Sequence, residues 1–211
     1  SFCHVHNGVE VLMEPYQSWF QQQDLRPAHR YYADLLRMLD WQRPGERWLL
    51  KTPAHLWALD VLAELFPDGS ILITHRNPLA VIASYCSMME AVFAMRGCTQ
   101  PPQLGRAVLE YVARSLERGM QARERSDPAR FLDIFYDDFI ADPMATIRRI
   151  YGHFSLALTT QAEAAMQRHV AAHPRGQHGV HRYDLERYGL DAAQVRGRFA
   201  AYLERTRLAC D

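Results

Sequence analysis

The stretch WLLKTPAHLWALDVLAELFPDGSILITHRNPLAVIAS, residues 48–84, predicts the fold of this chain. An apolar run at 48–50 predicts a strand, apolar residues at helical spacing over 56–66 predict a helix, and a β-branched run at 71–74 predicts a second strand. Consecutive strands joined by a helix in this way form a parallel pair. We therefore expect an α/β fold with a parallel sheet flanked by helices.

The remaining sequence predicts a third strand and several further helices. The strand is expected at 131–136, where apolar and aromatic residues precede two aspartates. Helices are expected at 27–39, 78–95, 104–125, 142–154, about 160–172 and 192–205. A chain of 211 residues, of which 48% are hydrophobic, can bury one core, so we expect a single domain over residues 1–211.

Composition argues against several classes of partner. The formal net charge is zero, so bulk attraction to nucleic acid or to a membrane surface is not expected. No apolar run approaches the ~18 residues of a membrane span. The four cysteines are scattered without a CxxC pair, which favours reduced thiols and a cytoplasmic location. Four histidines have a spacing that zinc would tolerate, but no cysteine pattern supports them, and no metal is expected; they are His169, His173, His178 and His181.

An anion site is predicted where the second strand meets the next helix. Arg76 follows the strand, and Pro78 begins a helix whose free N–H groups point back toward it. An arginine fork beside a helix N-terminus suits a phosphate. Ser84 lies two turns into the helix and could donate to the same group. The alternative is structural: Arg76 could pair with Asp137 or Asp138, and the serine could only pack.

Two further residues near the first predicted strand are candidates for chemistry. Lys51 is the only lysine among 24 basic residues, which suggests a site that needs a compact ammonium group. It could stabilise charge that develops on a transferring or leaving group. His55 is a candidate general base. A structural role is equally compatible with a histidine on a helix.

The order of these motifs resembles the nucleotide-dependent sulfotransferases. Residues 48–84 are similar to their central block, in the bacterial branch with a KSPxHL-type segment, a strand ending in HRxP and a later serine. FYDDFIADPMATIRRIYGHF, residues 135–154, resembles the YEDL-x-x-x-P segment, and HGVHRYDLERYGLD, residues 178–191, resembles a late segment of the family. The resemblance implies a P-loop-NTPase-like sulfotransferase fold. It also implies transfer of a sulfuryl group from 3'-phosphoadenosine 5'-phosphosulfate (PAPS) to a hydroxyl or amine without a metal, with adenosine 3',5'-bisphosphate (PAP) as product.

The resemblance also implies which residues would bind the donor. Arg76 and Ser84 would bind its 3'-phosphate, and Tyr136 would lie near the adenine. Arg175 and Gly176 would belong to a late phosphate-binding loop.

For the transfer itself, the resemblance places Lys51 near the sulfuryl group. His55 is the expected base for the acceptor, and Glu14 is the rival.

The sequence departs from the family in one respect. The Gly-rich PxSGTT loop that binds the 5'-phosphosulfate is not found, so we expect an amino-terminally incomplete form of the fold. The departure leaves two alternatives open: a noncatalytic nucleotide-binding or assembly module, or a nucleotide-kinase relative with Asp137 as the metal-holding carboxylate. The apolar helix after Arg76 suits a small-molecule or lipid-like acceptor. Unpaired sheet edges would favour a homo-oligomer.

Overall fold

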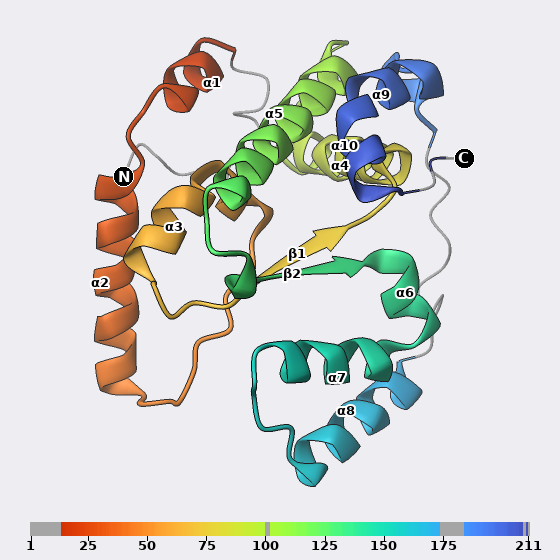
Figure 1. Cartoon of the computed structure of the whole chain (residues 1–211). Helices are drawn as coiled ribbons and strands as arrows, with labels where there is room; N and C mark the ends of the chain where they lie inside the picture. Colours follow the sequence, from red (N-terminus) through yellow and green to blue (C-terminus); the bar gives the residue numbers. More distant parts are fainter. Residues whose placement is uncertain (1–13, 100–101, 174–183, 209, 211) are drawn as a thin grey trace.

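The computed structural model describes residues 14–99, 102–173, 184–208 and 210. Short 3-10 helices (η) occur among the α-helices. In chain order the elements are α1 (Glu14–Gln21), α2 (Arg26–Gln42), η2 (Pro53–Ala58), α3 (Leu59–Leu65), β1 (Ile71–His75), α4 (Pro78–Met95), α5 (Leu104–Glu124), η3 (Pro128–Arg130), β2 (Phe131–Phe135), α6 (Tyr136–Ala141), α7 (Pro143–His153), α8 (Thr160–Ala172), η4 (Glu186–Tyr188), α9 (Ala192–Arg198) and α10 (Ala200–Thr206). The sheet lies between α3 and α5 on one side and α7 and α8 on the other (Figure 1).

The two described strands form a parallel pair, although the expected partner of the run at 71–74 was the run at 48–50. β1 pairs with β2 in a register that runs from Ile71 opposite Phe131 to His75 opposite Phe135. Because the strands are parallel and in register, their carboxyl ends meet at one edge of the sheet. The α/β fold with helices on both sides of a parallel sheet is therefore confirmed.

The strand predicted at residues 48–50 is wrong. This segment is irregular, and no strand pairs with it within the described residues. Its three side chains are exposed, and Leu49 retains 92% of its accessible surface. An apolar run becomes a strand only when a neighbour accepts its backbone hydrogen bonds, and the backbone ladder of β1 in this structure goes to β2.

Several helix boundaries also differ from the predictions. The helix expected at 56–66 begins with the 3-10 turn η2, whose first residue is Pro53, and only then becomes α3. The helix expected at 192–205 breaks at Phe199, between α9 and α10. α1 and α6 were not predicted, because a mixed apolar pattern and a run of six residues give little periodicity.

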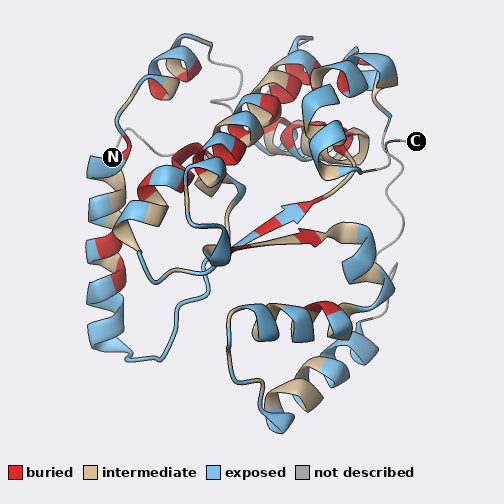
Figure 2. Ribbon diagram, viewed as in Figure 1, coloured by how far each residue is buried: buried red, intermediate tan, exposed pale blue. Residues whose placement is uncertain are grey.

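The main core lies between α4, α5 and α9 (Figure 2). Ile82, Met89 and Val108 are among its fully buried side chains. A smaller cluster fills the space between the sheet and the helices α3 and α5, and consists of Leu59, Ile73, Ala122 and Phe131 with Ile71 packed against it. The sheet is thereby fixed to α5, so that the strand ends are held by a packed layer.

The expectation that no apolar run approaches the length of a membrane span is wrong for α4, which is long and apolar enough, by length and composition alone, to cross a membrane. A third of the helix is buried inside the protein. Its residues Ile82, Cys86, Met89 and Phe93 belong to the main core, which accounts for much of its apolar character. Met88 and Met95, which the sequence groups with these residues, are exposed.

Candidate functional site

The carboxyl ends of the two strands bring Arg76 and Tyr136 together. Arg76 directly follows β1, and Tyr136 directly follows β2. The guanidinium carbon of Arg76 lies 4.3 Å from the centre of the Tyr136 ring, which is a cation–π contact. Both side chains are partly exposed. The pair therefore presents a positive charge, oriented by an aromatic ring, at the edge of the sheet.

The structural alternative for Arg76 does not hold in this structure. Asp137 and Asp138 are exposed in the first turn of α6, and neither forms an ion pair with Arg76. In the part of the chain that the structure describes, no side-chain N–H group of Arg76 donates a hydrogen bond to another residue. Its donors are thus available for a ligand, which is the condition that an anion site requires.

The beginning of α4 lies directly after Arg76. Asn77 caps the helix, and its Oδ1 accepts from the backbone N–H of Leu79 at 2.9 Å. Ser84 lies six residues after Pro78, or about 9 Å along the helix. Its side chain is partly buried and has no hydrogen-bond partner among the described residues. Arg76 thus directly precedes a helix N-terminus, whose free backbone N–H groups favour an anion, and Ser84 lies further along the same helix.

The structure places Lys51 and His55 on a different segment. Lys51 is exposed in the irregular stretch before η2. His55 lies within η2 and is partly buried, with its ring centre 6.3 Å from that of Tyr32 on α2. No hydrogen bond or ring contact joins Lys51 or His55 to Arg76 within residues 14–99.

The other predicted site residues cannot be placed in the site. Arg175 and Gly176 lie outside the described residues. Glu14 begins α1, and its side chain is likewise outside the description. Among the residues that the structure does describe, no group of three or more His, Cys, Asp or Glu side chains could hold a metal ion.

A polar network, which the sequence did not reveal, is centred on His75, the buried residue directly before Arg76. His75, the last residue of β1, is 2% exposed. Its Nε2 is 2.8 Å from Asp133 Oδ1 on β2, and its Nδ1 is 2.9 Å from the hydroxyl of Tyr202 on α10. Arg123 on α5 donates to both carboxylate oxygens of Asp133, at 2.7 and 2.6 Å. The only sequence signal was a histidine at the end of an apolar strand, which gives no indication of its partners.

Burial and the neighbouring side chains shift the pKa of the Asp133 carboxyl in opposite directions. Burial alone would raise its pKa, but the hydrogen bonds from His75 and Arg123, together with the positive charge of Arg123, hold the pKa below its ordinary value. Burial, together with the nearby Asp133 charge, raises the pKa of Tyr202. At neutral pH the network therefore contains an ionised aspartate and a protonated tyrosine.

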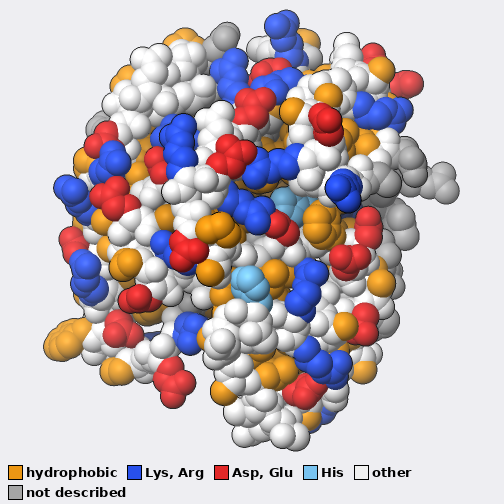
Figure 3. Space-filling view, in the orientation of Figure 1, with side chains coloured by type: hydrophobic (Ala, Val, Ile, Leu, Met, Phe, Trp, Pro, Cys, Tyr) orange, Lys and Arg blue, Asp and Glu red, His pale blue; other side chains and the backbone are white. Residues whose placement is uncertain are grey.

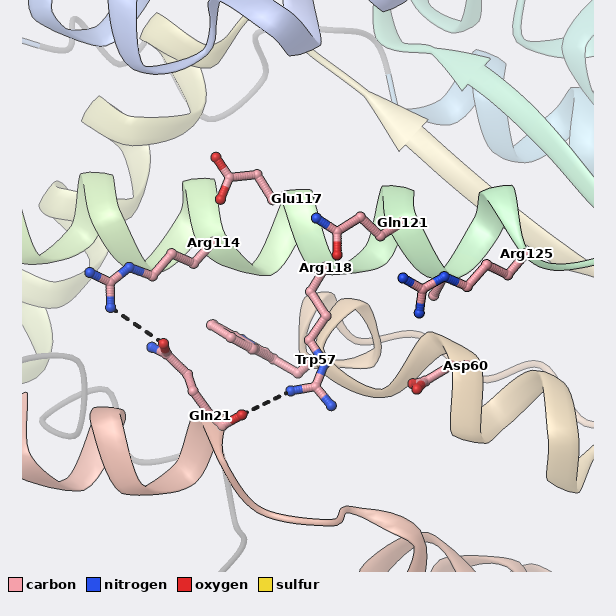
Figure 4. Close-up of a pocket in the computed structure, with 9 residues that line it drawn as sticks. Gln21, Trp57, Asp60, Arg114, Glu117, Arg118, Gln121 and Arg125 are labelled. Carbon is pink, nitrogen blue, oxygen red and sulfur yellow. Dashed lines mark hydrogen bonds between the residues drawn. The ribbon is translucent and has the colours of Figure 1, made fainter.

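A cavity of about 430 Å³ lies elsewhere, between α1, η2, α3 and α5 (Figure 4). Its charged lining includes Arg114, Arg118 and Arg125. Arg114 and Arg118 each donate to Gln21 at 3.3 Å, through its side chain and its backbone carbonyl respectively. None of the predicted site residues lines this cavity. On the face shown in Figure 3, charged side chains of both signs are interspersed, in keeping with the zero net charge.

The chain has a parallel sheet with an arginine beside a helix N-terminus at the carboxyl ends of its strands. This arrangement is typical of proteins that bind phosphate-bearing ligands. Comparison with known proteins identifies the family. Residues 9–161 match the sequence model of the Sulfotransferase family, and the chain belongs to this family. The resemblance stated from the sequence is thus confirmed.

The curated relatives are mycobacterial sulfotransferases. The omega-hydroxy-beta-dihydromenaquinone-9 sulfotransferases Stf3 of Mycobacterium bovis and of Mycobacterium tuberculosis are each 35% identical over 113 residues. The match covers 51% of this chain and 28% of each relative. The match spans far less than two thirds of the length of each relative. It therefore compares this chain with only a part of each relative.

Solved structures confirm the fold. The crystal structure of sulfotransferase STF9 from Mycobacterium avium superimposes with a TM-score of 0.81 at 29% identity, covering 90% of this chain and 49% of that one. Sulfotransferase STF1 from Mycobacterium tuberculosis H37Rv gives a TM-score of 0.75 at 34% identity, covering 88% and 48%. The chain thus has the sulfotransferase fold and spans about half the length of these structures.

Proposed function

We propose that this chain carries the nucleotide 3'-phosphate site and part of the transfer site of a sulfotransferase that uses PAPS as donor. The observation that carries the proposal is the set of available donors at the sheet edge. The side chains of Arg76 and Ser84 have no hydrogen-bond partner among the described residues. Arg76 lies just before α4, and Ser84 lies in its N-terminal half. A phosphate would satisfy both groups at once.

Tyr136 has a role in this proposal that differs from its role in the sequence prediction. Its ring supports the guanidinium of Arg76 from one side. This contact restrains the arginine before the ligand arrives, which reduces the entropy that binding must overcome. An adenine next to this pair would meet the same aromatic surface.

Lys51 and His55 are assigned to the transfer step. An acceptor oxygen attacks sulfur, the bond between sulfur and the phosphate oxygen breaks, and PAP leaves with the electron pair. Lys51 would stabilise the negative charge that develops on the leaving phosphate, and His55 would take the acceptor's proton. The Stf3 relatives are named for omega-hydroxy-beta-dihydromenaquinone-9, and we propose a lipid-like alcohol as acceptor here.

The test is a transfer assay on this chain with PAPS and a long-chain prenyl alcohol in detergent, in which mass spectrometry detects the sulfate ester. We expect product formation, and Lys51→Gln should lower the rate by about 10²-fold because it removes the charge that stabilises the leaving group. Arg43→Gln, at an exposed cationic position in the same irregular segment, should leave the rate unchanged. Equal rates for all three proteins would contradict the assigned role of Lys51.

A noncatalytic nucleotide-binding module is the second candidate. It is favoured by the separate placement of Lys51 and His55, which make no described contact with Arg76. This candidate predicts binding of PAP to the chain without any sulfate ester from PAPS. Absence of both binding and product would exclude both candidates.

A further inference from the structure

We propose that His75 is a positioning residue for the nucleotide 3'-phosphate: its buried network fixes the strand end from which Arg76 projects. The inference rests on the proposed function, because it deepens the role of the same site. It concerns the His75–Asp133–Tyr202 network described above, whose members belong to three different elements.

Each bond of the network crosses between elements. The bond from His75 to Asp133 joins β1 to β2, and the bond between Tyr202 and His75 joins α10 to β1. Arg123 ties β2 to α5. In addition, Arg149 on α7 donates to the backbone carbonyl of Asp133 at 2.8 Å. Three surrounding helices, α5, α7 and α10, therefore hold the strand pair at His75 and Asp133 in one arrangement.

The proton positions follow from the partners. Asp133 is ionised and can only accept, so Nε2 of His75 must carry a proton and donate to it. Nδ1 is paired with Tyr202 in either charge state: it accepts from the hydroxyl in a neutral imidazole and donates to the hydroxyl oxygen in a protonated one. Every polar atom of the imidazole is thereby paired, as a side chain that is 2% exposed requires.

Ring packing restricts the imidazole further. The His75 ring lies nearly parallel to those of Phe135 and Tyr202, with centroid distances of 5.1 and 5.8 Å and an interplanar angle of 26° in each case. Phe135 is the residue before Tyr136. The same stack therefore adjoins the backbone of both members of the cation–π pair.

The network affects how precisely the guanidinium of Arg76 is positioned. Arg76 is the next residue after His75, so a shift of the strand end moves the guanidinium directly. A displacement of about 1 Å at a ligand-holding group can cost up to about 10²-fold in function. We infer that the network contributes to affinity for the 3'-phosphate and not only to stability.

The experiment isolates the 3'-phosphate contact by calorimetry. PAP and adenosine 5'-monophosphate are titrated into the protein, and the ratio of the two affinities gives the contribution of the 3'-phosphate. Tyr202→Phe removes one hydroxyl and keeps the ring, while His75→Gln removes the bridging imidazole. Tyr188→Phe is the matched control, because its hydroxyl donates to Glu90 at 2.9 Å, outside the network.

We expect Tyr202→Phe to lower the affinity ratio about threefold to tenfold and His75→Gln to lower it further, with little change in affinity for the monophosphate. In an Arg76→Ala background, Tyr202→Phe should change the ratio no further, because the positioned group is gone. Tyr188→Phe should reduce the melting temperature and leave the ratio as in the unaltered protein.

Unchanged ratios in both network variants would overturn the inference while leaving the proposed function intact, since the network would then serve stability alone. A ratio near one in the unaltered protein would show that no 3'-phosphate site exists. That result would reject the proposed function and the inference together.

Discussion

Gly105 lies where the backbone of η4 crosses α5. A β-carbon at this position would stand 2.1 Å from the carbonyl oxygen of Tyr188, which is backbone and cannot rotate away. By contrast, a β-carbon on Gly152 in α7 would meet no atom within 4 Å. The two helical glycines therefore allow a matched comparison.

Gly105→Ala should lower the free energy of unfolding by roughly 2–4 kcal/mol through overpacking. Gly152→Ala should leave it unchanged or raise it by up to about 1 kcal/mol, because alanine is the better helix former. Urea unfolding followed by circular dichroism measures both. Equal effects of the two substitutions would show that α5 does not approach η4 this closely.

Asp133 gives a prediction for the dependence of stability on pH. Its pKa in the folded protein lies below the ordinary value of 3.8. The stability that this carboxylate contributes is therefore present above pH 3.8 and is lost as the pH falls through the lower, folded pKa. Asp133→Asn should reduce stability at pH 7 and flatten its decline below about pH 4.

Chemical unfolding between pH 7 and pH 2.5 measures this effect, with Asp68→Asn as an exposed control. The substitution could instead lower the unfolding free energy equally at every pH and leave its decline in acid unchanged. That result would mean that the carboxylate is not held ionised by His75 and Arg123.

At the level of elements, Arg130 joins η3 to the end of α3. Its guanidinium donates to the backbone carbonyls of Ala63, Phe66 and Gly69, at distances from 2.6 to 3.2 Å. These carbonyls lie at the end of α3 and in the loop before β1, and that of Phe66 also accepts from the backbone N–H of Gly69. The arginine thereby joins the segments that lead into the two strands.

Arg130→Ala should cost roughly 2–3 kcal/mol of unfolding free energy, because hydrogen bonds to a charged group are lost and the carbonyls of Ala63 and Gly69 lose this donor. Arg125→Ala is the control, since Arg125 is exposed and has no partner in the described ranges. Thermal unfolding of the two variants measures the difference. A loss for Arg125→Ala as large as for Arg130→Ala would contradict this account.

The elements also show what a sequence can predict. The apolar runs at 71–74 and 131–136 predicted β1 and β2, and the proline after Asn77 predicted the start of α4. The run at 48–50 looked equally favourable and was wrong. Apolar composition is visible in a sequence, but the strand that must lie beside it is not.

For the candidate site, the sequence predicted Arg76 and Ser84 from strand, helix and motif, and their binding role stays a prediction. The stacking of Arg76 on Tyr136 and the partners of His75 depend on which strands are neighbours and on a helix 127 residues away. Contacts of this kind are set by the tertiary arrangement and leave no periodic signal.

For the whole molecule, the exposed apolar segment at residues 48–50 has a consequence for association. Trp48, Leu49 and Leu50 are exposed next to Lys51, and exposed apolar segments favour contacts between chains. We expect the chain to self-associate as its concentration rises, and Leu49→Lys should weaken this association. Sedimentation velocity over a range of concentrations measures the effect.

Met95→Lys is the control for this prediction, because Met95 is also strongly exposed but ends α4, in another element. If Met95→Lys weakens association as much as Leu49→Lys does, net charge and not the 48–50 segment governs it.

The central claim is that the strand ends of this sulfotransferase-family chain form a site for the 3'-phosphate of a nucleotide. The most direct measurement is calorimetric titration of PAP, without Mg²⁺, into the chain and into Arg76→Ala and Arg96→Ala, with ADP as the comparison ligand. Arg96 follows α4 at an exposed position and serves as the control arginine. The account predicts that PAP binds better than ADP, that Arg76→Ala weakens PAP binding at least about tenfold, and that Arg96→Ala does not. The account is contradicted if PAP does not bind to the folded chain, or if Arg76→Ala leaves the affinity for PAP unchanged.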